Sequence, residues 1–253
     1  MAHPPSPRST ELAERLGRVR ARIALACRQV GRDPEELCLV AVTKFFPAAD
    51  AATLVRLGVG DLGESRDQEA AGKLEGLGAE LEGGPLPRMH MVGQVQTKKA
   101  RSVVRWADVV HSVDRPKLVT ALDRAVGRAL GEGERADPLD VLVQVDLDGG
   151  AAQGRGGVRP QEAVDLAERV AECEHLSLRG TMAVAPAGAA GDEAALTRAF
   201  AELQQVHGLI RGRFPQAQWL SAGMSGDLEQ AVGAGATHLR VGSGILGSRP
   251  PQG

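Results

Sequence analysis

The sequence predicts an α/β protein built as a single (β/α)8 TIM barrel with an additional N-terminal helix. Two observations predict this fold. Short apolar segments alternate with amphipathic helical patterns along the 253 residues, and no linker-like stretch divides them. The first segment, residues 37–43, is apolar almost throughout, as in parallel strands that are buried on both faces. A doubly wound open sheet is the alternative, because periodicity does not show whether a sheet closes.

The alternation gives eight strands, with helices between them. The strands are expected near residues 37–43, 60–63, 88–92, 108–113, 139–147, 176–184, 217–221 and 238–242. The helices are expected over residues 49–57, 68–77, 97–107, 115–130, 160–173, 193–211 and 227–234. Eight strands in a chain of about 250 residues are the strand number and length typical of a TIM barrel.

A further helix precedes the first strand. Leu12 and Leu16 recur at helical spacing, Ser9 or Thr10 can cap the N-terminus, and the helix is expected to end near Gly31.

These elements set the domain limits. We expect the barrel domain to span residues 9–249, between a disordered tail at 1–8 and a second tail at 250–253.

Composition and charge exclude several classes of function. A net charge of −2 and a pI near 6.3 argue against nucleic-acid binding. No apolar run approaches the ~20 residues of a membrane span, and the first eight residues lack the apolar region of a signal peptide. The three cysteines form no C-x-x-C pair, and the histidines show no metal-ligand spacing. We therefore expect a soluble, cytoplasmic protein without a metal and without a nucleic-acid or membrane partner. We also expect a monomer.

Lys44 directly follows the first predicted strand, at the end of the strand where TIM barrels carry their chemistry. Arginine supplies 25 of the 30 cations, and only five residues are lysines. Partial burial at the barrel rim favours a neutral amine, which is nucleophilic and can form a Schiff base with an aldehyde. The alternative is a lysine that extends from the strand end into solvent.

Two segments rich in Gly and Ser follow the last two predicted strands. Residues 221–227 are Ser-Ala-Gly-Met-Ser-Gly-Asp, and residues 240–247 are Arg-Val-Gly-Ser-Gly-Ile-Leu-Gly. The second contains a G-x-G-x-x-G pattern, but it does not open the βαβ unit that a Rossmann motif requires. Small residues let backbone N–H groups approach a phosphate, and TIM barrels often bind phosphate after strands 7 and 8. Together the segments predict a phosphate site; a helix-capping turn at Ser225 is the alternative for one segment alone.

The predicted amine and phosphate site are neighbours if the barrel closes, because the eighth strand then pairs with the first. An aldehyde that also carries a phosphate would satisfy both groups. Pyridoxal 5′-phosphate is the common cofactor of that description.

From about residue 10 to 249 the chain resembles the pyridoxal-phosphate homeostasis proteins, single-domain relatives of the alanine racemase barrel. Eight motifs in the same order make the resemblance specific. The segments that carry it are residues 41–44, 63–65 with 68–69, 90–96 with Lys99, 111–115, 143–146, 179–183, 221–225 with Asp227, and 240–243 with Gly247.

The resemblance implies that Lys44 holds pyridoxal 5′-phosphate as a Schiff base. The other cofactor-binding residues that it implies are Ser225, Gly242 and Ser243 at the phosphate, Ser221 and Arg240 near the phosphate or ring, Met224 and His90 in the pocket wall, and Ser65 beside the Schiff base. Ser65 replaces an Asn that is usual in the family, and Lys98 stands where the family usually has Asn before a Lys.

The resemblance also implies a role in intracellular cofactor homeostasis: the protein buffers pyridoxal 5′-phosphate or delivers it to apo-enzymes, without an established reaction. A racemase-like enzyme is the alternative. The alanine racemases that the barrel resembles use a tyrosine as their second base, and this chain contains no tyrosine. A third possibility, a Schiff-base aldolase, would share the lysine and the phosphate site but bind no chromophore. We therefore expect a carrier and not an enzyme.

Overall fold

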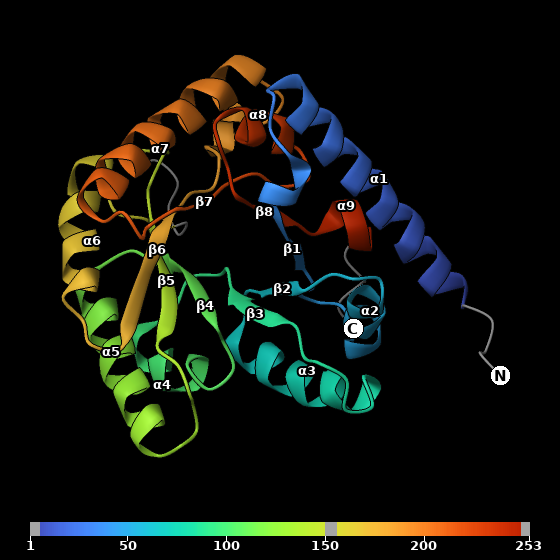
Figure 1. Ribbon diagram of the computed structural model, residues 1–253, viewed down its shortest axis with the longest axis horizontal. Coiled ribbons are helices and arrows are strands. Elements are labelled where there is room, and N and C mark those ends of the chain that lie inside the picture. The colour runs from blue at the N-terminus through green and yellow to red at the C-terminus, as the bar shows by residue number, and fades with distance from the viewer. Residues whose placement is uncertain (1–5, 150–155, 249–253) are drawn as a thin grey trace.

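Eight parallel strands close into a barrel in the computed structural model, which describes residues 6–149 and 156–248 (Figure 1). The strands are β1 (Cys38–Val42), β2 (Asp61–Glu64), β3 (Arg88–Met91), β4 (Val109–Val113), β5 (Leu139–Gln144), β6 (Leu176–Met182), β7 (Trp219–Ser221) and β8 (His238–Val241). Each overlaps its predicted range. Because each strand pairs with the next and β8 pairs with β1, no strand has a free edge, so the predicted closure is confirmed and the open sheet is excluded.

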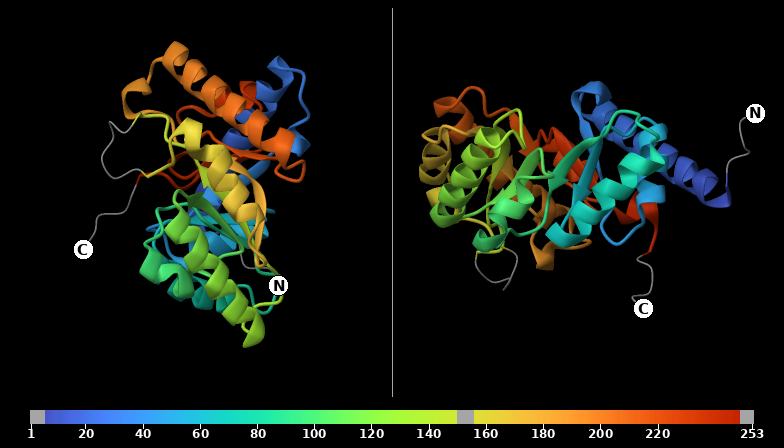
Figure 2. Two further views of the ribbon diagram at one scale, coloured as in Figure 1. Left: turned by 90° about the vertical axis from the view of Figure 1, so that its left-hand side faces the viewer. Right: turned by 90° about the horizontal axis from the view of Figure 1, so that it is seen from below.

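Helices cover the outside of the barrel, as both views in Figure 2 show. They are α1 (Pro7–Gln29), α2 (Ala48–Arg56), α3 (Asp67–Glu80), α4 (Ala100–Val103), α5 (Pro116–Gly131), α6 (Ala163–Ala171), α7 (Glu193–Arg213), α8 (Leu228–Gly233) and α9 (Ser243–Leu246). Short 3₁₀ turns lie at Pro34–Glu36, Thr97–Lys99, Pro160–Glu162 and Ala187–Ala189. Within the described ranges, no helix combines the length and apolarity that crossing a membrane requires.

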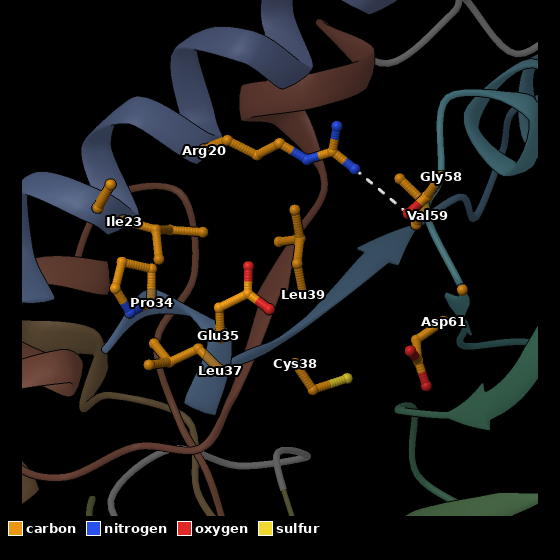
Figure 3. A pocket seen from close by; sticks show the side chains of 12 residues that line it. Arg20, Ile23, Pro34, Glu35, Leu37, Cys38, Leu39, Gly58, Val59 and Asp61 are labelled. Atoms are coloured by element: carbon orange, nitrogen blue, oxygen red, sulfur yellow. Dashed lines mark hydrogen bonds between the residues drawn. The ribbon is translucent and has the colours of Figure 1, made fainter. Parts of the chain in front are cut away.

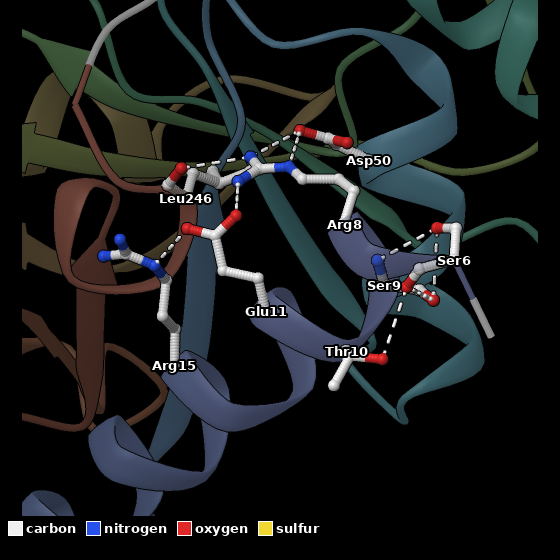
Figure 4. A network of polar contacts seen from close by, with 8 residues as sticks. All are labelled: Ser6, Arg8, Ser9, Thr10, Glu11, Arg15, Asp50 and Leu246. Carbon is white, nitrogen blue, oxygen red and sulfur yellow. Dashed lines mark hydrogen bonds and ion pairs between the residues drawn. The ribbon is translucent and has the colours of Figure 1, made fainter.

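The first helix begins earlier than predicted. Ser6, and not Ser9 or Thr10, is its N-cap: the Ser6 Oγ accepts a hydrogen bond from the Ser9 N–H over 3.1 Å (Figure 4). Pro7 explains the difference, because proline is favoured at the first helical position, where its missing N–H is not needed. Residues 7 and 8 therefore belong to the fold and not to the predicted tail. Residues 1–5 and the predicted tail at 250–253 lie outside the described residues.

Two helices differ from the expected pattern. The helix predicted over residues 97–107 is only the four-residue α4 with a 3₁₀ turn before it. After Val103 the N–H groups of Arg105 and Trp106 bond to carbonyls three residues back, and not four, so the α-helical pattern stops. The four-residue α9 was not predicted. Its Gly-rich sequence is too short to show a helical period.

The core is divided by the strands. The large apolar core lies between the barrel and the helices, and α1 contributes to it through Leu12 and Leu16, which are buried. A separate small cluster of Val109, Leu142 and Met182 lies on the other side of the strands, inside the barrel. The rest of the buried interior includes polar side chains that hydrogen-bond to one another: His90, His111, Ser221 and Arg240.

Candidate functional site

A cavity of about 560 Å³ opens at the C-terminal ends of β1, β7 and β8. Because β8 pairs with β1 and β7, these three ends are adjacent. The residues that line the cavity are Val42, Lys44, Val92, Val184, Met224, Ser225, Gly226, Arg240, Gly242 and Ser243. It therefore joins an amine, two hydroxyl groups and a guanidinium within apolar walls.

Lys44 stands two residues beyond the end of β1 and is half-buried at the cavity. The next residue, Phe45, has a φ of 71°, which is uncommon for a residue other than glycine. A left-handed residue at this point turns the chain sharply after Lys44. The surrounding structure must hold such a conformation in place, and strained residues of this kind often occur at functional sites.

Side chains of β2 and α3 hold the backbone on both sides of Lys44. The Lys73 Nζ donates to the carbonyl of Thr43 over 2.7 Å and lies 2.5 Å from the Glu64 carboxylate. The Thr43 hydroxyl donates to the same Glu64 oxygen over 2.7 Å. The N–H of Phe45 donates to the Glu69 carboxylate. Residues 43 and 45 are thus each tied to charged side chains.

Glu64 and Lys73 form a buried ion pair beneath the cavity rim. Their side chains are 0% and 5% exposed, so neither charge is solvated by bulk water. Burial raises the pKa of Glu64, and the charge and hydrogen bond of Lys73 oppose that rise. Within the described part of the chain, the second carboxylate oxygen of Glu64 has no hydrogen-bond partner. The buried Glu64 carboxylate therefore depends on Lys73 to balance its charge.

The two hydroxyl groups of the cavity come from neighbouring loops that touch. The Ser243 Oγ donates to the Ser225 Oγ over 3.2 Å, and the N–H of Gly244 donates to the same Ser225 oxygen over 3.0 Å. The Cβ that a larger residue would add at Gly242 would lie 3.3 Å from the Val42 carbonyl, so glycine lets this backbone approach β1 closely. The segments predicted as a phosphate site are therefore in contact.

The loop after β7 is shaped by Gly223 and Asp227. Gly223 has a φ of +90°, and a Cβ there would lie 2.7 Å from the Cβ of Ala231. The buried Asp227 carboxylate accepts a hydrogen bond from the N–H of Met224. These constraints fix where Met224 and Ser225 leave the barrel edge.

The N-terminal helix α1 hydrogen-bonds to the backbone of both segments that border the cavity. From α1, Arg22 donates to the carbonyl of Ser225 over 3.1 Å and pairs with Glu229 at 2.9 Å. Near the start of the same helix, Arg8 donates to the carbonyl of Leu246, the last residue of α9, over 3.0 Å (Figure 4).

Arg240 forms a buried part of the cavity wall. It is 4% exposed, and burial lowers its pKa to about 10, opposed by the charge of Asp227. Its guanidinium donates to the Ser221 Oγ over 2.6 Å and to the carbonyl of Ala183 over 2.8 Å. Two fixed hydrogen bonds leave the orientation of the group well defined.

The structure brings most of the predicted cofactor-binding residues together. Those that line the cavity are Lys44, Met224, Ser225, Arg240, Gly242 and Ser243. Ser221 does not line it but contacts Arg240 from inside the barrel. His90, expected in the pocket wall, is fully buried deeper in the interior. Ser65, expected beside Lys44, lines a neighbouring cavity of about 420 Å³.

Other residues around the site had no clear signal in the sequence. Glu69 and Lys73 are four residues apart in a helix, a spacing that is equally typical of a solvated helix surface. His111 offers a weak signal, because it is a polar residue in the otherwise mostly apolar segment 109–113. All five residues of this segment are buried in the structure. The described residues contain no cluster of three or more His, Cys, Asp or Glu side chains that could hold a metal ion.

Comparisons with known proteins agree along nearly the whole chain. A family model, "Alanine racemase, N-terminal domain", matches residues 15–250. The pyridoxal phosphate homeostasis protein of Mycobacterium tuberculosis is 46% identical over 248 residues, which cover 96% of this chain and 94% of that protein. The protein of the same name from Escherichia coli is 34% identical over 242 residues, which cover 94% and 97%.

A solved structure has the same fold. PipY of Synechococcus elongatus, determined with PLP bound, superposes with a TM-score of 0.76 at 30% sequence identity. The match covers 93% of this chain and 99% of PipY.

Proposed function

Because the chain belongs to the pyridoxal phosphate homeostasis proteins, a family built on the alanine racemase N-terminal domain, we propose that it binds pyridoxal 5′-phosphate at Lys44 and buffers or delivers it. The observation that carries the proposal is a single cavity that presents the Lys44 amine together with the touching hydroxyl groups of Ser225 and Ser243. The PLP-bound structure of PipY supports it.

The donor set of the cavity fits this cofactor. Ser225, Ser243 and the small Gly242 offer hydroxyl and backbone groups suited to a phosphate, which binds well where small residues let N–H groups come close. Val42 and Val184 supply apolar walls for a ring. When bound, pyridoxal phosphate supplies an aldehyde that condenses reversibly with a primary amine.

The chain's own residues orient and hold the cofactor. Lys44 supplies the amine, and the ties from Glu69 and Lys73 to its neighbours fix where the amine emerges. The cavity loops anchor the opposite end of the cofactor. Arg240, with its two hydrogen bonds, presents a fixed cation from the wall.

The cavity favours holding the cofactor over racemisation. Racemisation needs a proton acceptor on each side of the reacting carbon. Among the described residues that line the cavity, the ionisable ones are Lys44 and Arg240, and arginine is a poor proton acceptor. The whole chain has no tyrosine to supply a second base. We further propose a cytoplasmic monomer whose recipients are PLP-dependent apo-enzymes.

Absorption spectroscopy with chemical trapping tests the proposal. Protein reconstituted with pyridoxal phosphate should gain a visible absorption band, and borohydride reduction should attach the cofactor to Lys44, as peptide mass spectrometry would show. Lys44→Ala should lose both signals. The matched control is Lys117→Ala, which removes an exposed lysine of α5 and should keep both.

Two results would change this view. Wild-type protein that takes up no chromophore would overturn cofactor binding and favour an aldolase-like use of the amine. Racemisation of an amino acid above the Lys44→Ala background would replace the carrier with an enzyme.

A further inference from the structure

A line of hydrogen bonds crosses the barrel interior from Arg240, in the cavity wall, to Asp61. The Arg240 Nη1 donates to the Ser221 Oγ over 2.6 Å, and this oxygen lies 2.9 Å from the His111 Nδ1. The His111 Nε2 lies 2.8 Å from the His90 Nδ1, and the His90 Nε2 lies 2.8 Å from an Asp61 oxygen. Asp61 is the first residue of β2, so the line ends near the N-terminal edge of the barrel.

The groups at the two ends fix the hydrogens between them. Arginine only donates, so the Ser221 oxygen accepts and can give its own hydrogen to the His111 Nδ1. A carboxylate only accepts, so the His90 Nε2 must carry a hydrogen. If both rings are neutral, one arrangement remains: each histidine carries its hydrogen on Nε2 and accepts on Nδ1. Every bond in the line then points from Arg240 toward Asp61.

The charge states of His111 and Asp61 agree with this arrangement. Burial lowers the pKa of His111 well below its usual range, which keeps this fully buried ring neutral. Burial by itself would raise the pKa of Asp61, but interactions led by the hydrogen bond from His90 outweigh burial, and the pKa is lowered. Asp61 is therefore a carboxylate at neutral pH.

The line of hydrogen bonds can help to compensate the buried charge of Arg240. A cation removed from water needs compensation, and the charge of the buried Asp227 supplies part of it. The two described hydrogen bonds of Arg240, however, go to the neutral oxygens of Ser221 and Ala183. In this line each donor group lies on the Arg240 side of its acceptor, so the negative end of each donor dipole faces the guanidinium. Hydrogen bonds in such chains polarise and strengthen one another.

We propose that Asp61 is a positioning residue for the cofactor pocket, which acts through His90, His111 and Ser221 to hold Arg240 in place and charged. The effect on cofactor affinity rests on the proposed function. The hydrogen-bond line itself belongs to the chain alone.

Asp61 opens onto a different cavity from the one that holds Lys44. This second cavity, of about 520 Å³, lies at the N-terminal ends of β1 and β2 and is lined by Cys38, Glu35 and Asp61 among others (Figure 3). The Asp61 side chain is 26% exposed there. Solvent at one end of the barrel thus reaches a carboxylate that is connected to the pocket at the other end. Glu35 lines the same cavity, but its side chain is no part of the line, which makes it a matched control.

Nuclear magnetic resonance of the cofactor-free protein tests the line directly. Long-range ¹H–¹⁵N correlations distinguish the two neutral tautomers of a histidine ring. His90 and His111 should both carry hydrogen on Nε2 and none on Nδ1. A hydrogen on the Nδ1 of either ring would overturn the proposal, and this result does not depend on whether the protein binds pyridoxal phosphate.

Cofactor titration tests the consequence for the pocket. Asp61→Asn keeps an acceptor for His90 but removes the charge, and it should raise the Kd for pyridoxal phosphate about tenfold, the scale of one charge-assisted hydrogen bond. It should also shift the absorption band of the bound cofactor. Glu35→Gln should change the Kd less than about twofold, within the usual range for surface substitutions.

A double-mutant cycle separates positioning from general destabilisation. If Asp61 acts through Arg240, Asp61→Asn should have little effect on the Kd in an Arg240→Lys background. An unchanged tenfold effect in that background would overturn the proposal. So would an Asp61→Asn Kd that matches the Glu35→Gln value. If wild-type protein binds no cofactor, the proposed function fails, and the tautomers still decide whether the line exists.

Discussion

Lys44 follows Thr43, and Lys73 hydrogen-bonds to the carbonyl of Thr43, yet the two lysines have opposite environments. Lys44 is half-buried at an open cavity, whereas Lys73 is enclosed and paired with Glu64. An enclosed lysine in an ion pair balances a charge and is not free to react with a ligand. The division of roles follows from burial, since both side chains carry the same amine.

Replacing Lys73 should destabilise the protein strongly. Lys73→Met leaves the Glu64 carboxylate buried without its cation, and losing one partner of a buried pair costs about 3–5 kcal/mol in the free energy of unfolding. Adding Glu64→Gln should recover part of that loss, because it removes the unpaired charge. Urea denaturation of the cofactor-free proteins measures both. A double variant no more stable than Lys73→Met would contradict the role assigned to this pair.

Among single residues, the sequence predicted those whose position in the chain is informative by itself. Lys44 follows a continuous apolar strand, and Ser225 and Ser243 stand in Gly-rich turns, so their place at the barrel edge could be inferred. Ser65 and His90 were expected beside them but lie in a neighbouring cavity and in the interior. Which side of a short strand or turn a side chain faces depends on register and bulges, which periodicity does not fix.

Among the elements, the contact of β6 with β7 depends on one glycine. Gly180 pairs with Trp219, and its φ is +150°. A Cβ at this position would lie 1.9 Å from the Trp219 carbonyl oxygen, far inside van der Waals contact. The strand β7 is only three residues long, so it has few other bonds to hold it.

Gly180→Ala should therefore be severely destabilising. Backbone strain and the displaced strand together should lower the free energy of unfolding by roughly 3 kcal/mol or more. Gly208→Ala is the control, because Gly208 is exposed in α7 with nothing within 4 Å of the added Cβ. That change should stabilise the helix by about 0.5–1 kcal/mol. Equal effects in calorimetry would contradict this account.

The elements themselves were predictable because their signals are local. Apolar runs located all eight strands, and helical periods located the longer helices. Helix ends and short helices were less predictable. Pro7 moved the start of α1, and α9 is too short to have a period. Closure of the sheet depends on all strands together. The sequence therefore left a barrel and an open sheet as alternatives, and the pairing of β1 with β8 decides for the barrel.

The whole molecule buries several histidines in neutral form. Burial lowers the pKa of His207 to about 4 and that of His238 to about 3, and it lowers the pKa of His111 well below its usual range. An unfolded histidine has a pKa near 6.5, so between these values the unfolded chain binds more protons than the folded one. This contribution to stability is complete above about pH 6.5.

Stability should therefore fall as the pH drops from about 6.5 toward 4. Each buried histidine should add up to about 1.4 kcal/mol per pH unit to the slope of the unfolding free energy. His207 lies on α7, bonded to Thr181 and away from the cavity, so His207→Gln tests one contribution alone. Urea denaturation across this range should show a shallower slope for the variant. An unchanged slope would mean that His207 does not carry this linkage.

The position of α1 has a thermodynamic consequence for the molecule. Through Arg22 and Arg8 the helix contacts the carbonyls of Ser225, in the loop after β7, and of Leu246, at the end of α9, and both segments border the cavity. A ligand that binds only when these loops are in place adds RT ln(1 + [L]/Kd) to the free energy needed to undock the helix. If the proposed ligand binds near Lys44, local opening of α1 should become rarer as the ligand concentration rises, so the opening of this helix would report how much ligand is bound.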